Sequence, residues 1–498
     1  MSARSFPESA AVGRTRSRST FLFGGVLLLI YGVFLVRHAA FAVGGSDSSG
    51  YANVVRRLKS GALVSRPRSL DRLGLPDEWA QNFIPLGFVN GPRPGTMAPL
   101  YPPGFPAHLL AAASVGGWET GPYLVSPIAA VLTVLLIYLL GRDLRLPPGW
   151  ALGAAAVFAS WPVLVFQALQ PMSDVVATFW TVAAVFCARR ARHRPAWALV
   201  AGASFAISVL VRPTDAVLLL ALAFALPTTV HALALFAAGG LPFAGFFAAY
   251  NRRCYGAAWS TGYGKTELLK ELALSQFPPR ILYYTTELLS TLTPLVPLAW
   301  LALPADRRLA PRDRALLWAW FGSYFLLFSF YRHYGSIVFL RFLLPGVPAL
   351  ILGAALVGHR WLGERRASWT VLAALVCAGI LVFEWRGVRR EHILEIVADQ
   401  SVYPETCRWA AETVPPGAVV VAMQASGALE YYTDLNYVRW DWLDPATFAK
   451  LRQETGGDGR RWFALVFPVD AEEVRKRIPG RWTSLGERRG VALWRLDP

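Results

Sequence analysis

Long apolar runs separated by short polar connections fill most of the chain up to about residue 386. The first run, residues 21–43, follows a basic N-terminal segment and contains one charged residue, Arg37. About 20 apolar residues suffice for a helix to cross a bilayer. We therefore interpret this run as an uncleaved first span, with a signal peptide cleaved near Ala40-Phe41-Ala42 as the alternative. Further runs predict about eleven spans in all, and they lie at 121–141, 149–168, 174–188, 195–212, 214–231, 232–250, 281–303, 315–331, 339–358 and 367–384.

The basic residues of the short connections orient these spans. With the N-terminus inside, every basic cluster falls on the cytoplasmic side, as the positive-inside rule requires. Adding or removing one span would place later clusters on the wrong face. An odd number of spans then puts the C-terminus outside. The clusters are Arg142 and Arg145; Arg189, Arg190, Arg192 and Arg194; Arg307, Arg308, Arg312 and Arg314; and Arg360, Arg365 and Arg366.

The composition agrees with this pattern. Hydrophobic residues make up 54% of the 498 residues and charged residues 16%, against about 25% in a soluble chain. This excludes an ordinary cytosolic enzyme and predicts a multi-pass protein of the cytoplasmic (inner) membrane. The net charge of +17 lies in clusters between apolar runs, so no nucleic-acid partner is expected. The four cysteines form no CxxC pair, and Cys254 could pair with Cys407 if both lie outside.

The predicted fold is mainly α: a polytopic membrane helix bundle over residues 1–386 and a small extracytoplasmic α/β domain over residues 387–498. A first loop at 44–120 and a second loop at 251–280 also face outward. Residues 101–117 are apolar, but three prolines at their start leave too few residues for a span. We expect an interfacial helix on the outer face there.

The terminal domain alternates strand-like and helix-like runs, which suggests a layered sheet with helices. It has no GxGxxG, P-loop or Ser/His/Asp spacing that would give it chemistry of its own, so we interpret it as a partner-binding or lid module. The expected strands are 418–423, 437–442, 462–468 and 491–495, and the expected helices are 427–432, 445–454 and 470–478.

Asp47 opens the first loop just beyond the first span. It precedes an apolar stripe at helical spacing, formed by Tyr51, Val54, Val55 and Leu58, with cations off the stripe. This predicts a helix on the bilayer surface whose cations, Arg56, Arg57 and Lys59, face lipid phosphates. Asp47 at its start is either an N-cap or a general base at the membrane edge.

Asp174 is a second acid at the start of a helix on the outer side. It follows the outer end of the span at 149–168 and begins the next span. Ser173 could cap that helix and leave Asp174 free. Ionisable groups at this depth are costly and tend to be functional. A capping role is again the alternative.

Cations gather at the outer ends of other spans. Each alone is typical of a side chain that reaches the headgroup region. Together with two acids on one face, they favour an anionic lipid substrate, because guanidinium groups bind phosphate and a carboxylate accepts a hydroxyl or amine proton. They are Arg212, Arg252, Arg253, Lys265, Arg332, His333 and Arg341.

Five short motifs in this order resemble the GT-C membrane glycosyltransferases, and within that class the bacterial relatives of protein O-mannosyltransferases and of the lipid A aminoarabinose transferase. The resemblance covers about residues 1–386. The motifs are Ser46-Asp47-Ser48-Ser49-Gly50-Tyr51, Pro99-Leu100-Tyr101-Pro102-Pro103-Gly104-Phe105-Pro106, Pro171-Met172-Ser173-Asp174, Leu210-Val211-Arg212-Pro213-Thr214-Asp215 and Arg341-Phe342-Leu343-Leu344-Pro345.

The resemblance implies transfer of a sugar from a polyprenyl-phosphate donor to a glycan, lipid or protein acceptor at the outer face of the membrane. Asp47 would be the base, and Asp174 would orient the acceptor or bind the sugar. Tyr51 and Tyr101 would contact donor or acceptor. The departing lipid phosphate would be stabilised by Arg341 and nearby cations, namely Arg212, Arg332, His333 and Lys265.

The sequence departs from the family where many relatives have an acid pair, because Ser48 follows Asp47 here. We therefore expect no obligatory metal or other cofactor, although a divalent metal is possible. A transporter or flippase of a lipid-linked or anionic substrate is the alternative function. No internal repeat or pair of broken spans with a midplane site supports it. A scaffold that displays its outer domain is a third class, but it does not explain two acids at the membrane edge.

The topology is testable. A reporter fused after residue 498 should behave as extracytoplasmic, because an odd number of spans separates it from an inside N-terminus. A cytoplasmic signal from that fusion would contradict the assignment of sides.

Overall fold

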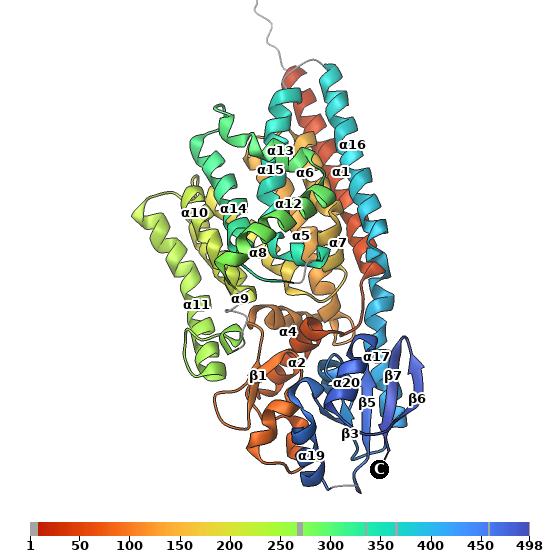
Figure 1. Cartoon of the computed structure of the whole chain (residues 1–498). Coiled ribbons are helices and arrows are strands. Elements are labelled where there is room, and N and C mark those ends of the chain that lie inside the picture. The colour runs from red at the N-terminus through yellow and green to blue at the C-terminus, as the bar shows by residue number, and fades with distance from the viewer. Residues whose placement is uncertain (1–7, 266–271, 334–335, 364–366, 457–458, 498) are drawn as a thin grey trace, which may run out of the picture.

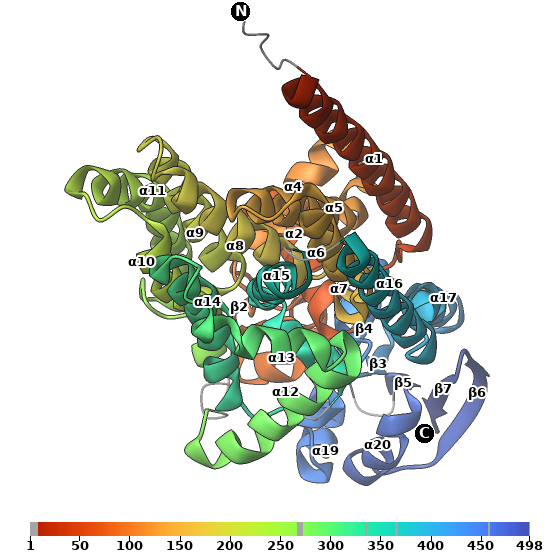
Figure 2. The same cartoon turned by 90° about the horizontal axis from the view of Figure 1, so that it is seen from above.

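The computed structural model describes residues 8–265, 272–333, 336–363, 367–456 and 459–497. A helix bundle stands above a smaller unit that contains the first loop and the terminal domain (Figure 1). In the view from above, α15 lies near the middle of the bundle with other helices around it (Figure 2). The helices of the bundle are α1 (Glu8–His38), α5 (Gly121–Asp143), α6 (Pro148–Ser160), α7 (Pro162–Ala168), α8 (Ser173–Arg190), α9 (Trp197–Val211), α10 (Leu219–Ala225), α11 (Val230–Tyr255), α12 (Phe277–Leu292), α13 (Leu295–Leu301), α14 (Pro311–Ser329), α15 (Val347–Gly358) and α16 (Ala367–Arg390).

Within the described residues, three helices are long and apolar enough to cross a membrane alone: α5, α11 and the Trp369–Arg390 part of α16. Three bent helix pairs raise this number to as many as six. The chain is thus a membrane protein, and the number of about eleven spans stays a prediction. Fewer helices pass this test than the eleven spans predicted, for two reasons. Some predicted spans are short helices, such as α9, and others, such as α8 and α14, carry three charged residues at their ends.

Proline marks each bend. Pro162 begins α7 after a bend of 62°, and Pro294 lies at the bend of 118° between α12 and α13. Pro345 lies at the bend of 79° between the 3₁₀ helix η7 (Ile337–Leu343) and α15. Proline has no backbone N–H and clashes with the preceding turn, so the helix stops and restarts. A further break separates α9 from the 3₁₀ helix η2 (Pro213–Leu218).

The described residues of the basic clusters lie at one end of the bundle and are linked by ion pairs. Arg189 at the end of α8 pairs with Asp143 at the end of α5 (2.7 Å) and with Asp313 at the start of α14. Arg360 pairs with Asp306 at 2.7 Å. This shared end agrees with the analysis of the connections, while the compartment it faces stays a prediction. Arg365 and Arg366 lie outside the described residues.

The terminal domain is a layered α/β unit, as predicted. Its sheet has the order β4-β3-β5-β7-β6, with β3 parallel to β4 and β5, and β7 antiparallel to β5 and β6. One face packs against α17 and α18, and the other against α19 and α20. The strands are β3 (Val419–Val421), β4 (Asn436–Val438), β5 (Trp462–Val466), β6 (Trp482–Arg488) and β7 (Val491–Leu496), and the helices are α17 (Ile396–Thr413), α18 (Ser426–Tyr432), α19 (Pro445–Glu454) and α20 (Ala471–Arg477).

The predicted strand 437–442 is wrong in its second half. The chain leaves the sheet after Val438, because the Arg439 N–H donates to the Asn82 carbonyl of the first loop (2.8 Å) and Trp440–Trp442 form a 3₁₀ turn. Strand β6 was not predicted, since its outward positions are polar and its register shifts at Gly486.

The first loop folds onto the terminal domain and completes its core. Trp79 and Phe83 are buried with Val419 and Trp462 in one hydrophobic cluster, and the Trp79 indole donates to Glu454 (2.6 Å). A helix, α4, forms within residues 101–117 as predicted, and its position at the membrane interface stays a prediction. The loop contains α2 (Ser46–Ser60), α3 (Arg68–Arg72), η1 (Asp77–Phe83), β1 (Phe88–Asn90), β2 (Met97–Pro99) and α4 (Gly104–Gly116).

Two predictions for these outer segments are wrong. Arg56 and Arg57 of α2 do not face lipid phosphates: Arg56 stacks on the Tyr431 ring (3.7 Å), and Arg57 pairs with Glu430 (3.0 Å). The terminal domain therefore binds the cations that the amphipathic pattern assigned to the bilayer. Cys254 and Cys407 are free thiols because they are buried in separate hydrophobic clusters.

The ion pairs at the basic end predict that substitution of the neighbouring residues Arg189 and Arg190 lowers stability by very different amounts. Arg189 is 7% exposed and neutralises two carboxylates, so Arg189→Met should cost about 3–5 kcal/mol of stability. Arg190 is 44% exposed, and Arg190→Met should cost at most about 1 kcal/mol. Thermal unfolding in detergent measures both. Equal losses in the two variants would contradict a buried network at this end.

Candidate active site

Asp47 lies in the first turn of α2 but does not cap it. The N-cap residue is Gly45, and the helix has no side-chain cap bond. The Asp47 carboxylate instead accepts a hydrogen bond at Oδ1 from the Tyr101 hydroxyl (2.6 Å) and one at Oδ2 from Arg341 Nη1 (2.8 Å). The N-cap interpretation of Asp47 is therefore wrong.

Close backbone contacts fix α2 in this position. A Cβ on Gly50 would overlap the Tyr101 ring and the Gly87 backbone, so the helix lies directly on the segment that carries Tyr101. Gly45 has φ +57°, a left-handed conformation that glycine adopts without strain. The hydroxyl of Ser48 turns back to the Gly44 carbonyl, away from the Asp47 carboxylate.

Asp174 forms a second ion pair beside the first. It lies in the first turn of α8, is almost fully buried and pairs with Arg212 Nη1. Met172 occupies the N-cap position, and Ser173 Oγ bonds to the Tyr51 hydroxyl at 3.0 Å. The capping roles suggested for Asp174 and Ser173 are therefore both wrong.

Phe342 joins the two ion pairs. The guanidinium carbons of Arg212 and Arg341 each lie 5.5 Å from the centroid of its ring. The pairs also interact electrostatically, since Asp47 experiences the charge of Arg212 and Arg341 that of Asp174. The structure thus gathers Asp47, Asp174, Arg212 and Arg341 in one cluster, although they come from four distant segments.

The pKa of the Asp47 carboxyl lies below its ordinary value. Burial is the largest single influence and raises the pKa, but the Arg341 charge and the hydrogen bonds from Tyr101 and Arg341 together outweigh it. Burial, and then the Asp47 charge, raise the pKa of Tyr101 well above its ordinary value, so Tyr101 is a neutral donor at neutral pH.

Aromatic rings line this cluster. Tyr51 packs against Tyr101 (4.6 Å between ring centroids) and edge-on against Phe105 (4.8 Å). Tyr263 lies 6.4 Å from Tyr101 and belongs to the turn Gly262–Lys265. Tyr263 and Phe342 were missed as site residues. The Gly-flanked position of Tyr263 and the position of Phe342 next to Arg341 were the signals available in the sequence.

The other predicted cations are placed differently. His333 is buried between Tyr283 and Phe339, and burial together with Arg280 lowers its pKa to about 4, so its ring is neutral at pH 7. The His333 ring lies 6.4 Å from that of Phe342, beside the cluster. Arg332 is exposed. The side chain of Lys265 lies outside the described residues.

Asp215 is a further buried acid next to the cluster. It accepts hydrogen bonds from Tyr324 (3.1 Å) and Thr181 (3.4 Å), and its backbone N–H donates to the Arg212 carbonyl (2.9 Å). These bonds hold the turn after α9 from which Arg212 extends. Asp215 was part of a motif noted in the sequence, but the burial of its side chain was not evident there.

The described residues offer little to a metal ion. None of them form a group of three or more His, Cys, Asp or Glu side chains suited to a metal. Asp47 and Asp174 are each already paired with a guanidinium. Independence from metal stays a prediction.

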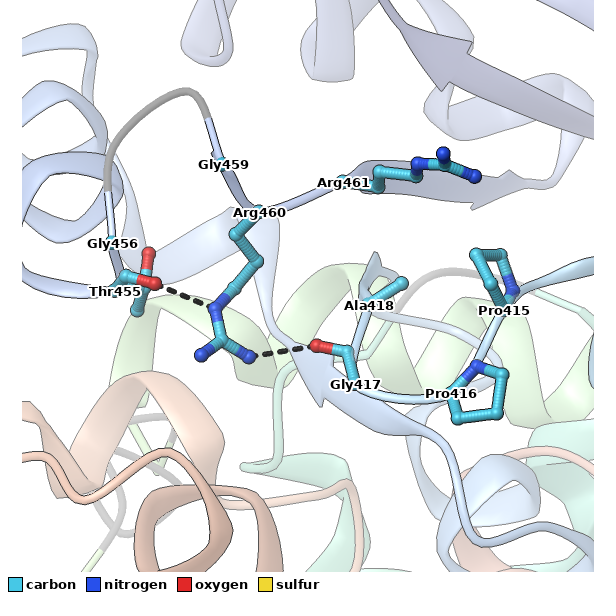
Figure 3. Close-up of a pocket in the computed structure, with 9 residues that line it drawn as sticks. All are labelled: Pro415, Pro416, Gly417, Ala418, Thr455, Gly456, Gly459, Arg460 and Arg461. Carbon is cyan, nitrogen blue, oxygen red and sulfur yellow. Dashed lines mark hydrogen bonds between the residues drawn. The ribbon is translucent and has the colours of Figure 1, made fainter.

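A separate pocket of about 370 Å³ lies in the terminal domain (Figure 3). Arg460 on its wall donates to the backbone carbonyls of Thr455 (2.6 Å) and Gly417 (2.7 Å). Among the described residues no acidic side chain lines it, so they do not form there the acid and cation pairing of the cluster around Asp47.

Comparisons with known proteins agree with the motifs. The family model "Dolichyl-phosphate-mannose-protein mannosyltransferase" matches residues 101–244. No curated protein matches the chain. The residues that the family model matches include Tyr101, Asp174 and Arg212 of the cluster.

The fold is shared with solved structures of low sequence identity. ArnT from Cupriavidus metallidurans bound to undecaprenyl phosphate superposes with a TM-score of 0.61 and 12% identity over 95% of this chain and 97% of that chain. The Archaeoglobus fulgidus oligosaccharyltransferase tethered with an acceptor peptide gives 0.55 and 14% over 96% and 74%. AglB from the same organism, in complex with an inhibitory peptide and a dolichol-phosphate, gives 0.52 and 11% over 92% and 71%. These matches confirm the resemblance to GT-C membrane glycosyltransferases.

Proposed function

We propose that the protein transfers one sugar from a polyprenyl-phosphate donor to a hydroxyl or amine acceptor at the outer face of the cytoplasmic membrane. The observation that carries this proposal is the direct contact between Asp47 and Arg341, a base and a phosphate-binding cation in one cluster. The shared fold supports it, because related structures bind undecaprenyl phosphate or a dolichol-phosphate. The acceptor peptide of the archaeal enzyme lends weight to a peptide among the possible acceptors.

In the proposed reaction, the acceptor oxygen or nitrogen attacks the anomeric carbon of the sugar. The bond from that carbon to the phosphate oxygen breaks, and its electron pair stays on the polyprenyl phosphate. Asp47 takes the acceptor proton. Arg341, with Arg212 beside it, stabilises the charge that develops on the leaving phosphate, and guanidinium geometry suits two phosphate oxygens at once.

The ion pair between Asp47 and Arg341 determines the order of steps in this reaction. Both Asp47 oxygens are engaged, by Tyr101 and by Arg341, so neither is fully available to an acceptor. A donor phosphate competes with Asp47 for Arg341 and frees Oδ2. Loss of that ion pair removes an influence that lowers the pKa of Asp47, so the carboxylate becomes a stronger base once the donor is bound. Donor binding thus precedes activation of the acceptor.

Asp174 has a supporting role in this scheme. It is paired with Arg212, so it orients Arg212 and presents its second oxygen to sugar or acceptor hydroxyls. The transport alternative is not favoured, since the paired acids and arginines form one cluster and the shared fold is that of transferases.

Asp47→Asn tests the base. Asparagine keeps the size of the side chain but cannot accept a proton, so transfer should fall about 100-fold or more while the variant stays folded. The assay follows release of undecaprenyl phosphate from undecaprenyl-phosphate mannose and undecaprenyl-phosphate aminoarabinose, with peptide and lipid A acceptors. In the wild type, kcat/KM, which reports the free enzyme, should fall off only below the ordinary titration range of an aspartate, because the pKa of Asp47 is lowered there.

The control is Asp71→Asn, an exposed acid of the same loop, which should keep normal turnover. Near-normal turnover of Asp47→Asn would remove Asp47 as the base and shift that role to Asp174.

Arg341→Lys tests the leaving-group site. Lysine keeps the charge but lacks the planar fork, so both transfer and binding of undecaprenyl phosphate should weaken about tenfold or more. Arg190→Lys, at an exposed position at the basic end of the bundle, is the matched control and should behave as the wild type. A fully active Arg341→Lys variant would reduce Arg341 to an anchor at the membrane interface.

A further inference from the structure

The terminal domain holds the backbone immediately before Asp47. We name residues 43–45, between α1 and α2, the strap. The Val43 N–H donates to the hydroxyl of Tyr432 at the end of α18 (2.6 Å). The Tyr403 ring of α17 lies so close to Gly44 that any Cβ there would overlap it. Gln424 donates to the Tyr403 hydroxyl (3.3 Å) and fixes that ring.

The same domain also holds the helix that follows the strap. The Asn53 amide donates to the Gly427 carbonyl (2.8 Å), and Arg57 pairs with Glu430 (3.0 Å). Both members of that ion pair are largely buried, at 15% and 9% exposure. A Cβ on Gly427 would overlap Ser49, so α18 lies directly on α2.

The bundle provides one anchor on the other side of the strap. The Ala40 N–H donates to the Leu169 carbonyl at the end of α7 (2.7 Å). The backbone is therefore anchored on the bundle at Ala40 and, three residues later at the start of the strap, on the terminal domain at Val43. Asp47 follows four residues later, so its distance from Arg341 depends on both units.

We propose that Tyr432 is a positioning residue for Asp47, and that the terminal domain is a working part of the active site as well as a partner or lid module. The proposal rests on the proposed function in taking Asp47 as the base. A base must be held within about 0.5 Å of its productive position, and a displacement of about 1 Å can cost 100-fold in rate. The Tyr432 hydroxyl bonds directly to the strap backbone at Val43.

Tyr432→Phe tests this, because it removes one hydroxyl and leaves the ring, which packs against a hydrophobic cluster of the terminal domain. Amide exchange of the peptide that contains residues 40–50, followed by mass spectrometry, should speed up about tenfold. With undecaprenyl-phosphate mannose or aminoarabinose as donor, kcat should fall about tenfold and KM for the donor should stay within twofold. Thr483→Val is the matched control, since its hydroxyl bonds only within the terminal domain, to Asp497.

A second pair of variants does not depend on Tyr432. Glu430→Arg should repel both Arg57 and Arg68, which pair with Glu430, and lower kcat. The double variant with Arg57→Glu should restore kcat in part, because it keeps the first pair with its charges exchanged while the repulsion from Arg68 remains. Unchanged exchange in Tyr432→Phe, or faster exchange with unchanged kcat, would overturn the proposal. If the wild type transfers no sugar, the proposed function fails, and the exchange measurement alone decides whether Tyr432 holds the strap.

Discussion

One end of the bundle depends on the neutralisation of two carboxylates by two arginines. An unpaired charge removed from water costs several kcal/mol, so the burial of Asp47 and Asp174 there depends on Arg341 and Arg212, which accompany them. Each arginine in turn needs a carboxylate or a phosphate. The pairing stabilises the cluster at rest, and in the proposed reaction a donor phosphate replaces Asp47 at Arg341.

Broken helices make this cluster possible. Arg212 directly precedes Pro213, and Arg341 lies in the 3₁₀ turn before Pro345. An unbroken helix would carry these arginines past the outer edge or into lipid, whereas the breaks end the helices inside the bundle. Phe342, placed between the two guanidinium groups, fixes their separation. The prolines that shorten the spans thus also place the charges.

The sequence predicted most helices, most of the terminal sheet and the main residues of the cluster. The features that it did not predict were missed for physical reasons. Apolar runs located the helices, and alternating runs located most of the terminal sheet, since both patterns depend on local burial. Short motifs identified Asp47, Asp174, Arg212 and Arg341. The pairing of Arg57 with Glu430 was not predictable, because an amphipathic helix shows which face is polar but not what covers it. Strand β6 and the turn after Val438 depend on contacts between distant segments.

The core shared by the first loop and the terminal domain imposes a delay during synthesis. Ser69 Oγ accepts a hydrogen bond from the backbone of Tyr437, which lies 368 residues later. At about 5–20 residues per second, the ribosome needs roughly 20–70 s to make that interval. During this time Trp79 and Phe83 lack the partners that bury them in the finished protein. The first loop of the nascent chain therefore leaves the translocation machinery with exposed apolar side chains. It needs protection by a chaperone until the last hundred residues of the chain are made.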